Sequence, residues 1–160
     1  MTNFEALLST LDRNRVEYIV VGGAAALAHG SARFTQDLDV VYSRTPDNLD
    51  RLVASLQDLK PYLRGAPPGL PFTWDRATLS HGLNFTLETS LGPIDLLGEI
   101  PGGGAYADLV HSCVELRLFA GTTKCLSLEQ LIRAKRAAGR PRDLEVLAEL
   151  EALREEASNG

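Results

Sequence analysis

Cysteine is scarce in this chain of 160 residues, which contains only Cys113 and Cys125. The two form no Cys-x-x-Cys pair and belong to no Cys/His cluster, so neither a disulfide framework nor a zinc site is supported. No apolar run approaches the length that spans a bilayer, and the first residues lack the basic start and apolar stretch of a secretory signal. We therefore expect a cytoplasmic protein with buried thiols and no membrane partner.

Basic residues are not in excess either. Lys and Arg number 16 against 21 Asp and Glu, which gives a formal net charge of −5. This balance argues against a surface that binds nucleic acid indiscriminately, although residues 132–142 contain five basic side chains and no acidic one. With 44% hydrophobic and 23% charged residues, the chain is expected to form a single domain over 1–160, with a core over about 1–126 and a helical segment over about 127–157.

The first half of the chain alternates helix and strand signals. A capping-box pattern at residues 2–5 opens an amphipathic helix, and an apolar run at 17–21 predicts a strand that ends in two glycines. An alanine-rich helix is expected over 24–29, followed by a strand through 37–41. Pro46 then begins a helix whose leucines form one stripe, so this helix should cover a face of the sheet.

The second half predicts two hairpins and two further helices. Residues 61–71 hold four prolines and two glycines, which is typical of a long surface loop of the kind that often serves substrates. Hairpins are expected at 84–97 and at 114–126, the second turning at Ala120-Gly121. A capping box starts a helix over about 127–139, and Pro141 can begin the last one.

Two aspartates carry the strongest chemical signal. Asp37 and Asp39 stand two residues apart on a predicted strand, so both project to one face while Leu38 and Val40 point to the other. Adjacent carboxylates repel each other unless a cation compensates them, and Mg²⁺ binds carboxylate and phosphate oxygens together. The first hairpin supplies a third strand carboxylate, Asp95. The three aspartates suit a pair of divalent metal ions in phosphoryl-type transfer.

Residues around these carboxylates could hold phosphates. Gly22 and Gly23 let the backbone approach a ligand closely, and amides at the start of the following helix can donate to phosphate oxygens. Arg33 lies close enough in sequence to the aspartate pair to reach the same phosphates, while Lys135 and Arg140 could reach a triphosphate or a nucleic-acid backbone. The alternatives are a solvated arginine at position 33 and, for the other two, a charged helix end that favours the macrodipole.

These residues together resemble the nucleotidyltransferase superfamily, whose fold is shared with the catalytic domain of DNA polymerase β. The motif Gly22-Gly23, a spacer and then Asp37-Leu38-Asp39 carries the resemblance. The segment Gly92–Leu97 looks like the strand that bears the family's third acidic residue, here Asp95. The resemblance implies an α/β (α+β) protein with the nucleotidyltransferase fold, in which helices flank a mixed β-sheet and the C-terminal segment is helical.

Within that superfamily, the chain is most similar to minimal bacterial nucleotidyltransferases related to the AbiEii and MenT toxins. Residues 21–25, Ala28-His29-Gly30, Arg33, Thr35 and Asp37 carry this finer resemblance. Residues 131–144, which contain Lys135, Arg140 and Asp143, resemble the C-terminal Lys/Arg/Asp motif of those toxins.

The resemblance implies an enzyme that transfers a nucleoside monophosphate from an NTP to an acceptor hydroxyl and releases pyrophosphate. Asp37, Asp39 and Asp95 would be catalytic and would hold two Mg²⁺ ions, with Asp95 either a general base or only a metal ligand. The residues expected to bind the nucleotide are Gly22, Gly23, Arg33, Lys135 and Arg140.

The resemblance also implies an acceptor, the 3′ end of a tRNA. This would make the chain the toxin of a toxin–antitoxin system and would imply a cognate antitoxin protein. Two alternatives stay open at this point. One is a small-molecule (aminoglycoside-like) or protein nucleotidyltransferase, and the other is a catalytically silent nucleotide-binding module or antitoxin.

Overall fold

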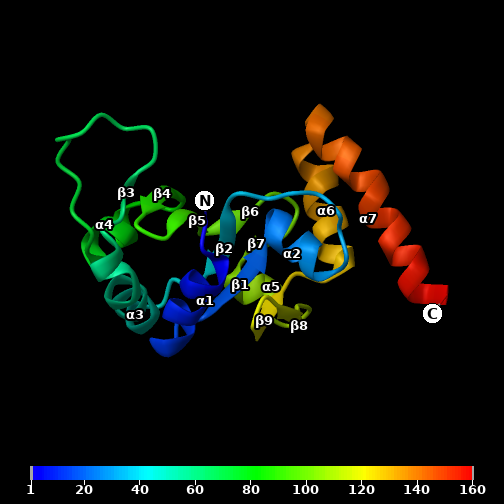
Figure 1. Cartoon of the computed structure of the whole chain (residues 1–160), viewed down its shortest axis with the longest axis horizontal. Coiled ribbons are helices and arrows are strands. Elements are labelled where there is room, and N and C mark those ends of the chain that lie inside the picture. Colours follow the sequence, from blue (N-terminus) through cyan, green and yellow to red (C-terminus); the bar gives the residue numbers. More distant parts are fainter. Residues whose placement is uncertain (1, 160) are drawn as a thin grey trace.

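A mixed sheet of seven strands forms the centre of the protein, as seen in a computed structural model that describes residues 2–159 (Figure 1). Its strand order is β3-β4-β5-β2-β1-β9-β8. In chain order these strands are β1 (Tyr18–Val21), β2 (Leu38–Tyr42), β3 (Tyr62–Leu63), β4 (Phe85–Thr89), β5 (Gly92–Leu97), β8 (Val114–Leu118) and β9 (Gly121–Cys125). A separate small hairpin joins β6 (Glu99–Ile100) to β7 (Gly104–Ala105).

Helices flank the sheet. They are α1 (Phe4–Arg13), α2 (Gly22–Ala28), α3 (Pro46–Leu56), α4 (Arg76–His81), α5 (Tyr106–Leu109), α6 (Leu128–Ala138) and α7 (Pro141–Asn159), with a 3-10 turn at Gln57–Leu59. In Figure 1, α3, α4 and the loop after β3 lie at one end of the long axis, and α6 and α7 lie at the other. The central strands therefore lie between two helical ends of the molecule. In the described chain, no helix combines the length and apolar character needed to cross a membrane.

The central strands fix the register on which the candidate site depends. β1 pairs antiparallel with β2 and parallel with β9, while β2 pairs parallel with β5. Leu38 and Val40 are almost completely buried, so one face of β2 belongs to the core. Because side chains alternate along a strand, that burial turns Asp39 to the opposite face. The mixed sheet and its flanking helices confirm the fold predicted from the motifs.

Several local predictions need correction. The N-cap of α1 is Asn3, whose side chain accepts a hydrogen bond from the Ala6 amide at 3.0 Å, and the Thr2 hydroxyl instead donates to the Gln36 carbonyl. The loop predicted over 61–71 contains β3, because Tyr62 and Leu63 pair with β4. Helix α2 begins at Gly22, two residues earlier than the alanine-rich run suggests.

Other boundaries agree with the sequence. The Thr45 side chain caps α3 and Pro46 is its first residue. Ser127 and Gln130 form the predicted capping box of α6, which ends at Gly139 in the left-handed conformation (φ 64°). The second large hairpin is formed by β8 and β9 as predicted, but its turn is Phe119-Ala120, one residue earlier than expected, because Gly121 already pairs with Leu118.

Candidate active site

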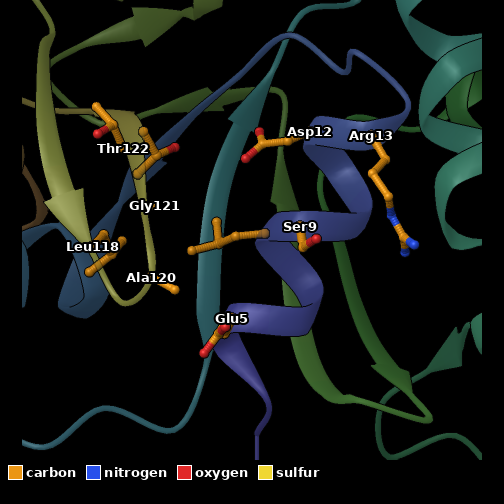
Figure 2. Close-up of a pocket in the computed structure, with 10 residues that line it drawn as sticks. Glu5, Ser9, Asp12, Arg13, Leu118, Ala120, Gly121 and Thr122 are labelled. Carbon is orange, nitrogen blue, oxygen red and sulfur yellow. The ribbon is translucent and has the colours of Figure 1, made fainter.

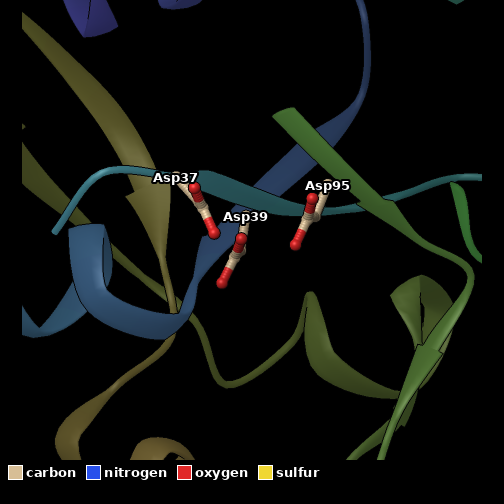
Figure 3. A group of neighbouring side chains, drawn as sticks. All are labelled: Asp37, Asp39 and Asp95. Atoms are coloured by element: carbon tan, nitrogen blue, oxygen red, sulfur yellow. The ribbon is translucent and has the colours of Figure 1, made fainter. Parts of the chain in front are cut away.

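Three half-buried carboxylates meet at the central strands, on the face opposite Leu38 and Val40. Asp37 lies just before β2, Asp39 lies within it, and Asp95 lies on β5 directly beside Asp39 in the parallel register. One oxygen of each carboxylate lies within 4.8 Å of the others, and Figure 3 shows the three side chains directed into the same space. The structure therefore brings together the three aspartates that the sequence assigned to catalysis and metal binding.

The cluster has too little positive charge for its carboxylates. Oδ1 of Asp39 is buried and has no hydrogen-bond partner among the described residues. Burial raises the pKa of Asp39 to about 7, and the nearby Asp95 and Asp37 carboxylates raise it in the same direction. Three carboxylates, one of which has an unpaired buried oxygen, form a donor set that fits a divalent cation such as Mg²⁺. The residues present thus match the metal that the fold family implies.

Gly22 makes room for this cluster. A Cβ built on Gly22 would lie 2.4 Å from Oδ2 of Asp39, and the residue has a φ of +62° that other residue types rarely adopt. β1 and β2 set this approach, since Val21 is paired with Asp39 in the antiparallel register. Glycine at this position is therefore needed by the Asp39 carboxylate itself, in addition to the phosphate approach expected from the sequence.

A cavity of about 340 Å³ opens beside the glycine pair, between α2, residues 31–35, α6 and α7. Its walls include four of the five residues predicted to bind the nucleotide, namely Gly22, Gly23, Arg33 and Lys135. Leu131, Val146 and Leu150 supply an apolar surface, and Phe34, which is 84% exposed, also lines it. The cavity thus combines two cationic side chains with an apolar wall, and none of the three aspartates lines it.

The three predicted cationic residues are placed differently from one another. Nε of Arg33 lies 3.6 Å from Oε1 of Glu149, so this side chain is held by α7. Lys135 is salt-bridged to Asp143 at 3.3 Å, yet its ammonium is near enough to Asp39 to lower the pKa of that carboxyl. Arg140 does not line the cavity. Of the three, Lys135 has the closest connection to the carboxylate cluster.

Asp143 is a buried carboxylate that joins α6 to α7. Only 1% of its side chain is exposed, and its Oδ2 accepts hydrogen bonds from Nε of Arg140 at 2.6 Å and from the Arg140 amide at 3.1 Å. Its Oδ1 accepts from Lys135 at 3.3 Å and from Nη2 of Arg140 at 3.2 Å. Hydrogen bonds from Arg140 hold the pKa of Asp143 well below its usual range. Arg140 therefore serves this ion-pair network.

The basic segment 132–142 is less available than its sequence suggests. Lys135 and Arg140 are paired with Asp143, and Nη2 of Arg136 lies 2.7 Å from Oε1 of Glu151. Three of its five cations are thus partly neutralised by acids of α7. This arrangement weakens the segment as a face for a nucleic-acid backbone.

Arg64 is a site residue that the sequence reasoning missed. Its Nη2 donates to Oδ1 of Asp95 at 2.8 Å, and its Nη1 lies 3.8 Å from Oδ2 of Asp37. The residue follows β3, in the segment that the sequence assigns only to a proline-rich loop. Its proximity to Asp95 depends on strand pairing between β3, β4 and β5, for which the sequence offers no local signal.

A second cavity, of about 390 Å³, lies between α1 and the β8–β9 turn. Figure 2 shows Glu5, Ser9 and Asp12 of α1 facing this space, with Leu118 and Thr122 across it. None of the predicted site residues lines this cavity. The space beside Gly22 and Gly23 is therefore the better candidate for a nucleotide.

The fold and the carboxylate cluster define a class: a mixed α/β protein with three acids grouped at the central strands beside a glycine turn. No family model matches the chain, and no curated protein matches it in sequence. Solved structures do match it.

The lincomycin-bound lincosamide antibiotic adenylyltransferase LnuA aligns with 95% of this chain and 98% of its own, at 15% identity and a TM-score of 0.60. ANT(2″)-Ia in complex with adenylyl-2″-tobramycin aligns with 95% of this chain and 92% of its own, at 17% identity and a TM-score of 0.56. A Thermotoga maritima protein assigned to the nucleotidyltransferases, TM1012, covers 100% of this chain and 97% of its own, at 14% identity and a TM-score of 0.53. The chain therefore has the nucleotidyltransferase fold. The finer resemblance to AbiEii and MenT toxins stays a prediction.

Proposed function

We propose that this chain is a metal-dependent nucleotidyltransferase that moves a nucleoside monophosphate from an NTP to an acceptor hydroxyl. The observation that carries the proposal is the cluster of Asp37, Asp39 and Asp95, with its unpaired Asp39 oxygen, beside Gly22. Proteins rarely group three half-buried carboxylates without a compensating cation, because each added negative charge raises the free-energy cost of ionising the others.

The three aspartates would hold the divalent metal, in keeping with the pair of Mg²⁺ ions suggested by the sequence. When bound, Mg²⁺ supplies charge neutralisation for the triphosphate and lowers the pKa of the acceptor hydroxyl. Lys135 would contact phosphates at the mouth of the cavity, since it lines the cavity and also acts electrostatically on Asp39. Leu131, Val146 and Phe34 would receive the nucleoside on the apolar side.

The acceptor would enter from the other side of the carboxylates. The cavity lies toward α6 and α7, whereas Asp95 stands on β5 and is flanked by β4 and Arg64. A nucleotide in the cavity would leave the β3–β4 side of the cluster, where Arg64 lies, as the approach for the hydroxyl. Asp95, on that side, is the carboxylate best placed to accept the hydroxyl proton or to orient the acceptor.

A small molecule is the acceptor class that we favour. The basic segment 132–142 supports a tRNA acceptor less than its composition does, because three of its five cations are paired with acids of α7. Two proteins of similar fold also carry small molecules: LnuA is bound to lincomycin, and ANT(2″)-Ia is bound to adenylyl-2″-tobramycin. The tRNA 3′ end, with its implied toxin role, remains the competing acceptor and is tested in the same experiment.

The test is a labelling assay with each of the four α-labelled NTPs, Mg²⁺ and three acceptor sets. The sets are a panel of hydroxylated small molecules that includes aminoglycosides and lincosamides, total tRNA, and cell protein. The control is the Asp37→Asn/Asp39→Asn double variant, which preserves side-chain size. Metal-dependent label on a small molecule, only with the intact protein, supports the proposal, and label on tRNA or protein keeps the activity but changes the acceptor. If the wild type neither transfers label nor binds NTP with Mg²⁺, the proposal is wrong.

A further inference from the structure

The backbone of Arg64 is fixed two strands away from Asp95. β3 pairs antiparallel with β4, and the Arg64 amide extends this ladder by donating to the Thr86 carbonyl at 2.9 Å. Thr86 is in turn the β4 partner of Asp95 on β5. The sheet itself therefore delivers the Arg64 side chain to the edge of the carboxylate cluster, and the exposed loop that follows is not needed to hold it there.

The guanidinium of Arg64 spans two of the three carboxylates. Nη2 lies 2.8 Å from Oδ1 of Asp95 and 2.9 Å from the Leu87 carbonyl oxygen, while Nη1 lies 3.8 Å from Oδ2 of Asp37. Nε lies 3.4 Å from Oε1 of Glu88 on β4 but makes no hydrogen bond to a described residue. The side chain is 26% exposed, so water screens these contacts only in part. A positive charge thus already lies where carboxylates of the candidate metal site converge.

A divalent ion at the cluster would meet this charge at short range. It would draw on oxygens of Asp37 and Asp95, the two carboxylates that Arg64 also contacts. Two cations that share carboxylates within a few ångströms repel each other, and a doubly charged ion feels twice the repulsion of a singly charged one. Arg64 and the metal therefore cannot both be bound at full strength.

We propose that Arg64 is an internal counter-cation that competes with a divalent metal ion for Asp37 and Asp95. This inference rests on the metal site of the proposed function. In the metal-free protein, Arg64 offsets part of the repulsion among the three aspartates. A metal ion that arrives with a triphosphate brings negative charge that offsets Arg64, whereas a bare ion does not. Arg64 thus favours the metal–nucleotide complex over the bare metal.

The experiment measures the affinity for Mn²⁺ alone, by electron paramagnetic resonance and calorimetry, without nucleotide. The Arg64→Gln variant keeps a hydrogen-bond donor but removes the charge, and we expect it to bind Mn²⁺ roughly tenfold more tightly than the wild type. Arg64→Lys keeps the charge and should stay close to the wild type. The matched control is Arg76→Gln, which removes an exposed arginine that is paired with Asp50 away from the cluster.

Thermal melting gives a second, independent readout. Without metal, Arg64→Gln should melt at a lower temperature than the wild type, because the aspartates lose their counter-charge. Saturating Mn²⁺ should reduce this difference, since the metal replaces the lost charge. Arg76→Gln should show no such dependence on Mn²⁺.

Two results would overturn the inference. If folded Arg64→Gln binds Mn²⁺ with unchanged affinity, the charge of Arg64 does not oppose the metal. If it binds Mn²⁺ more weakly, Arg64 orients Asp95 for the metal instead of competing with it. In either case, nucleotide transfer by the wild type would leave the proposed function standing. Absence of Mn²⁺ binding in both the wild type and Arg64→Gln would remove the metal site and, with it, both proposals.

Discussion

Two carboxylate clusters in this protein have opposite charge balances. At Asp143, both oxygens accept hydrogen bonds from cationic side chains, and the pKa of the carboxyl lies well below its usual range. At Asp39, one oxygen is buried with no partner among residues 2–159, and the pKa is raised to about 7. The same residue type is therefore stabilised as an anion in one place and destabilised in the other.

The difference separates a structural cluster from a candidate functional one. The Asp143 network is complete and ties α6 to α7 without need of a ligand. The Asp39 cluster is incomplete even though Arg64 pairs with Asp95, and an incomplete cluster of charges costs stability unless a ligand completes it. Sites that bind cations and phosphates are expected to show this kind of deficit.

The largest effect should come from Asp39→Asn. We expect nucleotide transfer to fall by at least roughly 10²- to 10³-fold, because the variant removes a charge that the transition state requires. The metal-free variant should melt at or above the temperature of the wild type, since the change relieves repulsion among carboxylates. Transfer rates check the loss of activity and thermal melts check the stability. Asp47→Asn, on the exposed first turn of α3, is the control for both. Full activity in Asp39→Asn would contradict the assignment of the cluster.

The two carboxyls should also respond in opposite directions to pH. Asp39 has a folded-state pKa of about 7, above the ordinary value of 3.8 for an aspartate, so between these values the folded protein binds more protons than the unfolded chain. Its contribution is fully present below about pH 4 and is lost as the pH rises through 7. Asp143 has a lowered pKa, so its contribution is present above the unfolded-state pKa and is lost only in strong acid.

Urea unfolding of the metal-free protein between pH 5 and 8 tests this difference. Relative to Asp39→Asn, the wild type should gain stability on the order of 2–3 kcal/mol as the pH falls across that range. Mg²⁺ should flatten the dependence, because a bound cation favours the ionised form of Asp39. A wild type that tracks Asp39→Asn at every pH would show that the Asp39 carboxyl is not under strain.

Breaking the Asp143 network should lower the stability of the protein throughout the neutral pH range. Asp143→Asn leaves two cations without their carboxylate, and we expect a loss of about 2 kcal/mol in the free energy of unfolding. The cost is kept to this size because the Arg140 side chain is half exposed and can be hydrated. Glu151→Gln removes the exposed partner of Arg136 and should cost less than about 1 kcal/mol. Equal effects of the two changes in urea unfolding would contradict the structural role of Asp143.

The sequence predicts those features of the two clusters and of the fold that depend on contacts between residues close together in the chain. Asp37 and Asp39 share a face because strand side chains alternate, and the burial of Leu38 fixes which face. Pro46 and the Ser127 capping box mark helix starts through contacts within one turn. These signals lie within a few residues of the features that they specify.

The parts that escaped prediction depend on pairings between distant segments. Arg64 reaches Asp95 only because β3 adds to the edge of β4, and two residues of strand within a proline-rich segment give no periodic signal. The neutralisation of Arg136 by Glu151 requires α7 to fold back along α6 in one particular register. For Gly22 the sequence predicts only the approach of a ligand, because the close approach of Asp39 depends on the β1–β2 register.

The smallest effect is expected at Lys135, whose side chain connects the two carboxylate clusters. Its Nζ lies 3.3 Å from Oδ1 of Asp143, and its charge lowers the pKa of Asp39. Lys135→Gln should reduce the free energy of unfolding by less than about 1 kcal/mol, because Arg140 still holds Asp143. It should also move the pH dependence associated with Asp39 to higher pH, since a cation that favoured the ionised form is lost. Urea unfolding across the pH range measures both effects, and Arg133→Gln, on the same helix, serves as the control. A drop in stability with no movement of the pH dependence would mean that Lys135 belongs to the Asp143 network alone, and its proposed contact with phosphates would lose its support.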